Sequence, residues 1–157
     1  MAQQPVPAAM DGGCKCGHVR YRVTGAPLFI MACHCTDCQQ QTASAFSLAM
    51  VLDDAQFAVM AGQPREWAKR GSSGKLSHEF TCPVCAGWTH TRPDSQPGKT
   101  VVRPSTLDDH RSVVPVGQIY TRSALPWARL AVQFSYEEEF DDPKPMIEAF
   151  AIGRGGS

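Results

Sequence analysis

The segment Cys33-His34-Cys35-Thr36-Asp37-Cys38 places three cysteines within six residues, and the interpretation of the whole chain starts from it. In extended backbone, side chains two residues apart project to the same side, so Cys33 and Cys35 point together. A turn after them would bring Cys38 to the same point. The spacing therefore predicts three sulfur ligands for one metal ion, with a fourth tetrahedral position left open.

The remaining four cysteines form two pairs, one before this segment and one after it: Cys14-Lys15-Cys16 and Cys82-Pro83-Val84-Cys85. We expect these pairs to meet in a closed zinc site that holds the fold together. A second zinc ion at the triplet would be available for chemistry, because an open position can take water or substrate. The expected ligands are Cys14, Cys16, Cys82 and Cys85 in the closed site, and Cys33, Cys35 and Cys38 in the open one.

Other uses of the same residues stay open. The outer pairs can instead form a redox dithiol, a disulfide or an iron–sulfur cluster, although a cluster gives the triplet no role. A His or Asp ligand can close the triplet, or the triplet can hold no metal. By alternation His34 points away from the metal, and Thr36 or Asp37 is expected to cap a helical turn. His78, four residues before Cys82, can face the metal side or serve a structural role.

The composition indicates one domain with a substantial core, since 43% of the 157 residues are hydrophobic. Lys and Arg number 15, as do Asp and Glu, so no basic face for nucleic acid is expected. No apolar run approaches the roughly 18 residues of a membrane span. The first 13 residues lack the features of a signal peptide. We therefore expect a cytoplasmic protein whose odd number of cysteines serves as ligands rather than disulfides.

Short apolar alternations separated by turn residues predict a mainly β fold. The clearest lies at residues 18–24, where Val19, Tyr21 and Val23 alternate with Arg20 and Arg22. Further strands are expected at residues 28–33, 46–52, 57–60, 76–82, 100–103 and 119–121, with a single helical turn at residues 36–41.

The sequence divides into a flexible tail at residues 1–10, a zinc-binding domain at residues 11–142 and a C-terminal tail at residues 143–157. In the last segment, Met146, Ile147, Phe150 and Ile152 predict a short amphipathic helix. Two roles for it stay open: docking on the core, or a self-association contact that would make the protein a homodimer.

Taken together, these motifs resemble the family of glutathione-dependent formaldehyde-activating enzymes, whose domain is shared with centromere protein V. The resemblance covers roughly residues 11 to 135. It rests on Gly12-Gly13-Cys14-Lys15-Cys16-Gly17-His18-Val19-Arg20-Tyr21, on the triplet segment, on residues 42–46 and 80–85, and on Ile119 and Pro126-Trp127. It implies a β-tent zinc fold in which the four-cysteine site is structural and Cys33, Cys35 and Cys38 are catalytic.

The resemblance also implies a reaction and a partner. The partner would be a small-molecule thiol, glutathione in the family. The reaction would be that of a zinc-dependent carbon–sulfur lyase of the S-(hydroxymethyl)glutathione synthase type, in which a zinc-bound thiolate adds to formaldehyde or a related carbonyl. The alternative is a non-catalytic, zinc-stabilised module that binds thiols or another partner.

The chain departs from the family pattern at two kinds of position. Gln39-Gln40-Gln41 stands where the family tends to carry basic residues. Ala43 and Ala86 stand where glycine is usual, and glycine adopts positive φ at such turns without steric strain. We expect Gly87 to take over the second of these turns.

Overall fold

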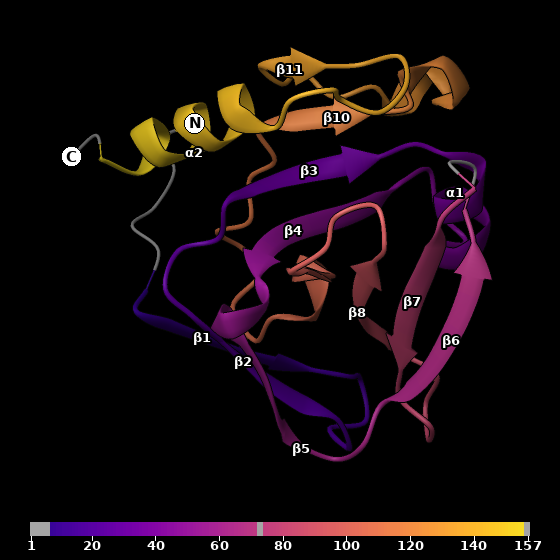
Figure 1. The fold of residues 1–157 in the computed structure, drawn as a ribbon, viewed down its shortest axis with the longest axis vertical. Coiled ribbons are helices and arrows are strands. Elements are labelled where there is room, and N and C mark those ends of the chain that lie inside the picture. Colours follow the sequence, from indigo (N-terminus) through magenta and orange to yellow (C-terminus); the bar gives the residue numbers. More distant parts are fainter. Residues whose placement is uncertain (1–6, 72–73, 156–157) are drawn as a thin grey trace.

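The computed structural model describes residues 7–71 and 74–155, and they form the mainly β fold that the sequence predicts (Figure 1). The strands are β1 (Ala9–Gly13), β2 (Arg20–Thr24), β3 (Phe29–Cys33), β4 (Ser47–Asp53), β5 (Phe57–Ala61), β6 (Arg65–Arg70), β7 (Leu76–Thr81), β8 (Trp88–Pro93), β9 (Lys99–Val102), β10 (Gly117–Ile119) and β11 (Phe134–Ser135). The helices are α1 (Thr36–Thr42) and α2 (Lys144–Gly155), and the short 3-10 turns are η1 (Asp54–Gln56), η2 (Pro104–Thr106), η3 (Thr121–Ser123) and η4 (Pro126–Ala128).

The strands form two sheets. The smaller has the order β1-β2-β5, and the larger has the order β11-β10-β3-β4-β9-β8-β7-β6. Within the larger sheet, β10 pairs in parallel with β3 and β11, whereas the other pairings are antiparallel. Figure 1 shows this sheet curving so that β6 and β7 approach the end of β3 where α1 begins. The curvature brings residues distant in sequence around one cavity.

The core lies between the two sheets and continues under α2. All five residues of β3 are buried, because both of its edges are paired and both of its faces are covered. In β2, Tyr21 and Val23 are buried while Arg22 is exposed, as the period-two pattern predicts. The hydroxyl group of Tyr21 lies 2.7 Å from that of Thr106, so a polar contact also joins the small sheet to η2, the turn that follows β9.

The strand boundaries agree with the sequence prediction in part. The predicted strands at residues 18–24, 28–33, 46–52, 57–60, 76–82 and 100–103 correspond to β2, β3, β4, β5, β7 and β9. The strand expected at residues 119–121 lies two residues earlier, as β10. Strands β1, β6, β8 and β11 were not predicted.

The two ends of the chain have different surroundings. The predicted tail at residues 1–10 overlaps residues 1–6, which lie outside the described residues, and Ala9 and Met10 already belong to β1. Helix α2 packs on β3, with Met146 and Phe150 buried. Gly117 makes room for it, since a Cβ atom there would lie 2.9 Å from the sulfur of Met146. The C-terminal helix is therefore docked on the core.

Among the helices that the structure describes, none combines the length and the apolar character needed to cross a bilayer.

Candidate metal centres

The first sulfur cluster is built by two hairpin loops. Cys14 and Cys16 lie between β1 and β2, and Cys82 and Cys85 lie between β7 and β8. The four sulfur atoms lie within 4.8 Å of one another, although 66 residues separate Cys16 from Cys82. The structure therefore brings together the two cysteine pairs that the sequence places far apart, and the cluster joins the small sheet to the large one.

The spacing of these sulfur atoms suits a tetrahedral metal ion. The sulfur of Cys16 lies 3.6 Å from that of Cys14 and 3.7 Å from that of Cys82. A zinc ion with Zn–S bonds of about 2.3 Å implies sulfur–sulfur edges of about 3.8 Å. The backbone N–H of Val19 donates to the sulfur of Cys14 at 3.2 Å, and that of Val84 donates to the sulfur of Cys82 at 3.4 Å. Such donors stabilise thiolate ligands, so the group can hold a metal ion.

The turn after Cys85 differs from the sequence prediction that Gly87 would adopt positive φ. Ala86, not Gly87, takes the left-handed conformation, with φ of 59°. Gly87 instead lies against the cluster, since a Cβ atom there would lie 3.4 Å from both the sulfur of Cys85 and the Cβ of Cys14, at the limit of ordinary van der Waals contact.

The second sulfur cluster lies where β3 gives way to α1. Cys33 ends β3, Cys35 is the N-cap residue of α1, and Cys38 lies inside the helix, with all three sulfur atoms within 4.8 Å of one another. The sulfur of Cys35 accepts a hydrogen bond from the backbone N–H of Cys38 at 3.3 Å. The expectation that Thr36 or Asp37 caps this helix is therefore wrong. One cysteine both starts the helix and orients the next cysteine toward it.

His34 points away from this cluster, as alternation along the strand predicts. Its side chain is fully buried, and its Nε2 atom lies 3.1 Å from Oε1 of Gln118. Its carbonyl oxygen accepts hydrogen bonds from Nε2 of Gln39 at 2.7 Å and from the hydroxyl group of Ser123 at 2.9 Å. These contacts fix the backbone between Cys33 and Cys35.

The three thiols do not ionise independently. Hydrogen bonds from Cys33 and Cys35 lower the pKa of the Cys38 thiol, and the nearby Ser47 and Arg103 act in the same direction. The contacts with Cys35 and Cys38 raise the pKa of the Cys33 thiol. The three thiols therefore act as one group, and the release of protons from it would be favoured by a bound cation.

The triplet lines a cavity of about 180 Å³. Glu79 on β7, Thr91 on β8 and Arg103 after β9 form part of its wall. Among the other lining residues are Met31, Asp37, Ser47, Lys69, Lys75, Trp88 and Tyr120. The sulfur atoms of the triplet therefore border a space that a small molecule can enter.

A polar network forms one side of this cavity. Glu79 is only 5% exposed, and its carboxylate lies 3.1 Å from the ammonium group of Lys69. Gln41 joins them: its amide nitrogen donates to Glu79, and its amide oxygen accepts from Lys69 at 2.7 Å. Gln41 and Gln39 are therefore committed to contacts within the protein, and the positive groups of the cavity, Lys69, Lys75 and Arg103, lie outside α1.

Sequence reasoning missed Glu79, Lys69 and Arg103 as cavity residues. The available signal was weak. Glu79 lies inside a predicted strand and Arg103 ends another, and a charged residue at such positions indicates a polar face. Nothing in the sequence says which face of each strand turns toward the cysteines, because that depends on the curvature of the sheet.

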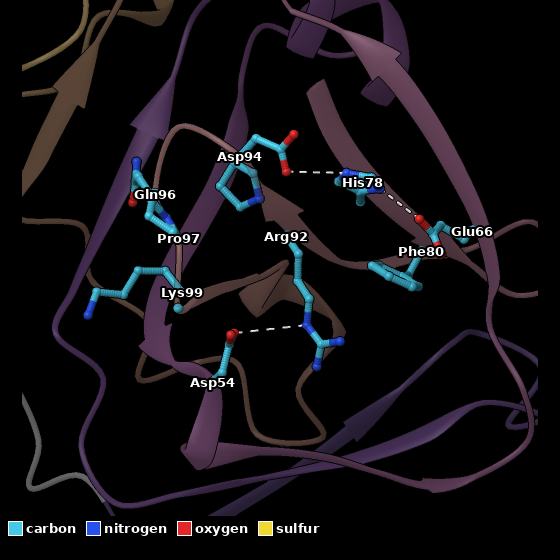
Figure 2. A pocket seen from close by; sticks show the side chains of 11 residues that line it. Asp54, Glu66, His78, Phe80, Arg92, Asp94, Gln96, Pro97 and Lys99 are labelled. Atoms are coloured by element: carbon cyan, nitrogen blue, oxygen red, sulfur yellow. Dashed lines mark hydrogen bonds and ion pairs between the residues drawn. The ribbon is translucent and has the colours of Figure 1, made fainter. Parts of the chain in front are cut away.

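His78 lies on the opposite face of β7 from Glu79, in a second hollow of about 380 Å³ (Figure 2). Its ring nitrogens lie 2.7 Å from Glu66 and 3.3 Å from Asp94. Figure 2 shows Arg92 and Phe80 on the same side. The alternative in which His78 faces the metal side is therefore wrong, and the histidine serves as a link between strands.

Two comparisons place this geometry among known proteins. The model of the family described as "Glutathione-dependent formaldehyde-activating enzyme" matches residues 9–123. The fold is also similar to the crystal structure of a Rhodobacter sphaeroides protein, with a TM-score of 0.53 and 18% sequence identity, over 81% of this chain and 99% of that one. The second similarity supports the fold alone, whereas the first spans both sulfur clusters.

Proposed function

The chain belongs to the family of glutathione-dependent formaldehyde-activating enzymes, and from this membership we propose that it is a zinc-dependent carbon–sulfur lyase. The proposed substrates are a small thiol, with glutathione as the first candidate, and formaldehyde or a related carbonyl compound. The observation that carries the proposal is the difference between the two sulfur clusters. Four cysteines make a closed group, while three border a cavity.

In this proposal, Cys14, Cys16, Cys82 and Cys85 hold a structural zinc ion, and Cys33, Cys35 and Cys38 hold a catalytic one. Thiolate sulfur is a preferred zinc ligand, and three protein ligands are typical of catalytic zinc sites. Bound at the triplet, zinc would keep the substrate thiol ionised at neutral pH and close to the carbonyl compound.

The reaction balances without a further reactant. The thiol sulfur forms a bond to the carbonyl carbon, the carbon–oxygen double bond becomes a single bond, and the thiol proton ends on that oxygen. With glutathione and formaldehyde, the product is S-(hydroxymethyl)glutathione. In the reverse direction the carbon–sulfur bond breaks and the hydroxyl proton returns to sulfur. The protein contributes by holding both reactants in one small cavity.

The residues of the chain have distinct tasks in this proposal. Glu79, Lys69 and Gln41 form a rigid polar wall, because each satisfies the hydrogen-bonding groups of the others. The hydrogen bonds of His34 hold the backbone between Cys33 and Cys35 in place. No described contact identifies a general base, so in this proposal the thiol proton passes to solvent when the thiol binds as a thiolate, and solvent returns a proton to the carbonyl oxygen after the carbon–sulfur bond forms.

The test is the rate of exchange between free and adducted glutathione at equilibrium, measured by two-dimensional exchange NMR. Thiols add to formaldehyde without a catalyst, so the rate must be compared with a protein-free sample. We expect exchange to be faster with the wild-type protein and to return to the background rate with Cys35→Ser. Retention of the folded spectrum by Cys35→Ser would separate lost catalysis from lost folding.

A thiol-binding module without catalysis is the second candidate. It is favoured by α1, which presents glutamines where the family tends to carry basic residues and uses Gln39 and Gln41 for internal contacts. Calorimetry distinguishes the two: binding of glutathione with no increase in the exchange rate would support the module. Absence of both binding and rate enhancement would contradict the proposed lyase.

A further inference from the structure

Arg103 is a cation in the wall of the triplet cavity, and its hydrogen-bond partners among the described residues are neutral. Its Nη1 atom donates to the hydroxyl group of Ser47 at 3.2 Å and to the carbonyl of Leu48 at 3.1 Å. Its Nη2 atom donates to the hydroxyl group of Thr91 at 3.1 Å. The guanidinium carbon lies 3.9 Å from the centre of the Trp88 ring. The group is therefore held in a fixed orientation by two strands, β4 and β8.

The charge of Arg103 has no carboxylate partner among the described residues. Glu79, the carboxylate whose charge acts on Arg103, is paired with Lys69. The Nε atom of Arg103 is buried and makes no hydrogen bond within the described part of the chain. A buried, unpaired cation is costly, so its retention calls for a compensating negative charge.

Thiolates at the three cysteines would supply that charge. Cys33, Cys35 and Cys38 line the same cavity as Arg103. Burial lowers the pKa of Arg103, and the electrostatic influence of Cys38 and Cys33 opposes this effect. Three thiolates and one divalent cation carry a net charge of about −1, and a fourth thiolate would bring it to about −2. A cationic wall residue offsets this excess in a low-dielectric setting.

We propose that Arg103 is a positioning residue that neutralises the three-cysteine centre and thereby favours an anionic fourth ligand over a neutral one. The inference rests on the proposed function, since it assumes a divalent metal ion at the triplet. It deepens that function by naming the chemical class that the open position accepts: thiolates and other anions. It also assigns a role to a residue that lies far from the cysteine motifs in sequence.

The experiment uses the full chain with zinc in the four-cysteine site and cobalt(II) at the triplet, where absorption reports each sulfur ligand. Two probes are titrated, 2-mercaptoethanol as a thiolate donor and imidazole as a neutral ligand. Arg103→Met should weaken cobalt binding at the triplet by about 10- to 100-fold, the usual effect of losing a group that supports a metal ligand. It should also weaken thiolate binding by about tenfold or more, with imidazole binding much less affected.

Two further variants make the test specific. Arg103→Lys keeps the charge and should restore most of the preference for the thiolate. Arg92→Met removes an arginine from the opposite face of β8, where the side chain is 48% exposed, and should leave both titrations unchanged. An equal loss of thiolate and imidazole binding in Arg103→Met, without rescue in Arg103→Lys, would overturn the inference and leave the proposed function standing. Failure of the wild-type triplet to take up cobalt would overturn both.

Discussion

Two alanines occupy backbone conformations that suit glycine better. Ala43, the residue that ends α1, has φ of 49°, and Ala86, in the loop of the four-cysteine cluster, has φ of 59°. An L-residue in the left-handed region loses about 1–2 kcal/mol to steric strain. Glycine avoids the strain but gives up about 0.5–1 kcal/mol of chain entropy on folding.

We therefore expect Ala43→Gly and Ala86→Gly each to stabilise the metal-loaded protein, by up to about 1 kcal/mol. Urea unfolding at a fixed zinc concentration measures the change in the free energy of unfolding. Ala58→Gly, at an exposed position in β5, is the control with the opposite sign, because glycine weakens a strand. Destabilisation by all three substitutions would show that the two turns are not strained.

At the residue scale, sequence reasoning located these two turns but not their detail. The absence of glycine at Ala43 pointed to strain, whereas at Ala86 the left-handed conformation was expected one residue later, at Gly87. The ligand candidates followed from thiol chemistry. The N-cap residue of α1 was not predicted, because the sulfur of Cys35 accepts the capping hydrogen bond that was expected of Thr36 or Asp37.

At the scale of elements, His78 links three parts of the large sheet. It lies on β7, Glu66 lies on the edge strand β6, and Asp94 follows β8 (Figure 2). The hydrogen bond with Glu66 and the negative charge of Asp94 raise the pKa of His78. A raised pKa in the folded state means that folding favours the protonated ring.

The stabilisation by His78 is therefore complete below the unfolded-state pKa of about 6.5 and is lost as pH rises through the higher folded-state value. We expect His78→Gln to lower the urea midpoint more at about pH 6 than at about pH 8.5. Glu66→Gln should reproduce most of this pH dependence, since it removes the main partner. A larger effect of His78→Gln at the higher pH would contradict the proposed link.

A strand could be predicted from the sequence where its apolar side chains face one core. Strands β2, β3 and β4 carry apolar residues that face one core, so their patterns are clear. Strand β6 is exposed along most of its length, and β8 buries Thr89, His90 and Thr91, so neither alternates between apolar and polar residues. Their place in the sheet depends on pairing with β7, a long-range property that a local pattern does not contain.

At the scale of the whole molecule, the cysteine count predicted more than periodicity did. Pairing the outer cysteines implied that residues near 15 and 84 meet, and the structure places them in adjoining loops of the two sheets. The order of strands in the large sheet could not be inferred in this way. Neither could the contribution of Arg103 and Glu79 to one cavity, because both depend on how the sheet curves.

The joining of the two sheets by the four-cysteine cluster leads to a prediction about global stability. Other links exist, including the ion pair of Arg20 with Asp108 and the contact of Tyr21 with Thr106, but the ion pair is exposed and so contributes little. A structural zinc site supplies about 10–16 kcal/mol in small zinc domains. The whole stability of a domain is about 5–15 kcal/mol, so loss of the ion should be decisive.

We expect Cys82→Ser to abolish the cooperative thermal transition, because it removes a buried thiol of the cluster that we propose to hold the structural ion. Cys38→Ser is the matched control: it removes a ligand of the triplet and should leave the transition largely intact while emptying only that site. Circular dichroism and zinc content per chain measure both effects on the same samples. A native transition in Cys82→Ser, or equal unfolding by the two substitutions, would contradict the division into one structural and one open site, since that division requires the two clusters to differ in what they stabilise.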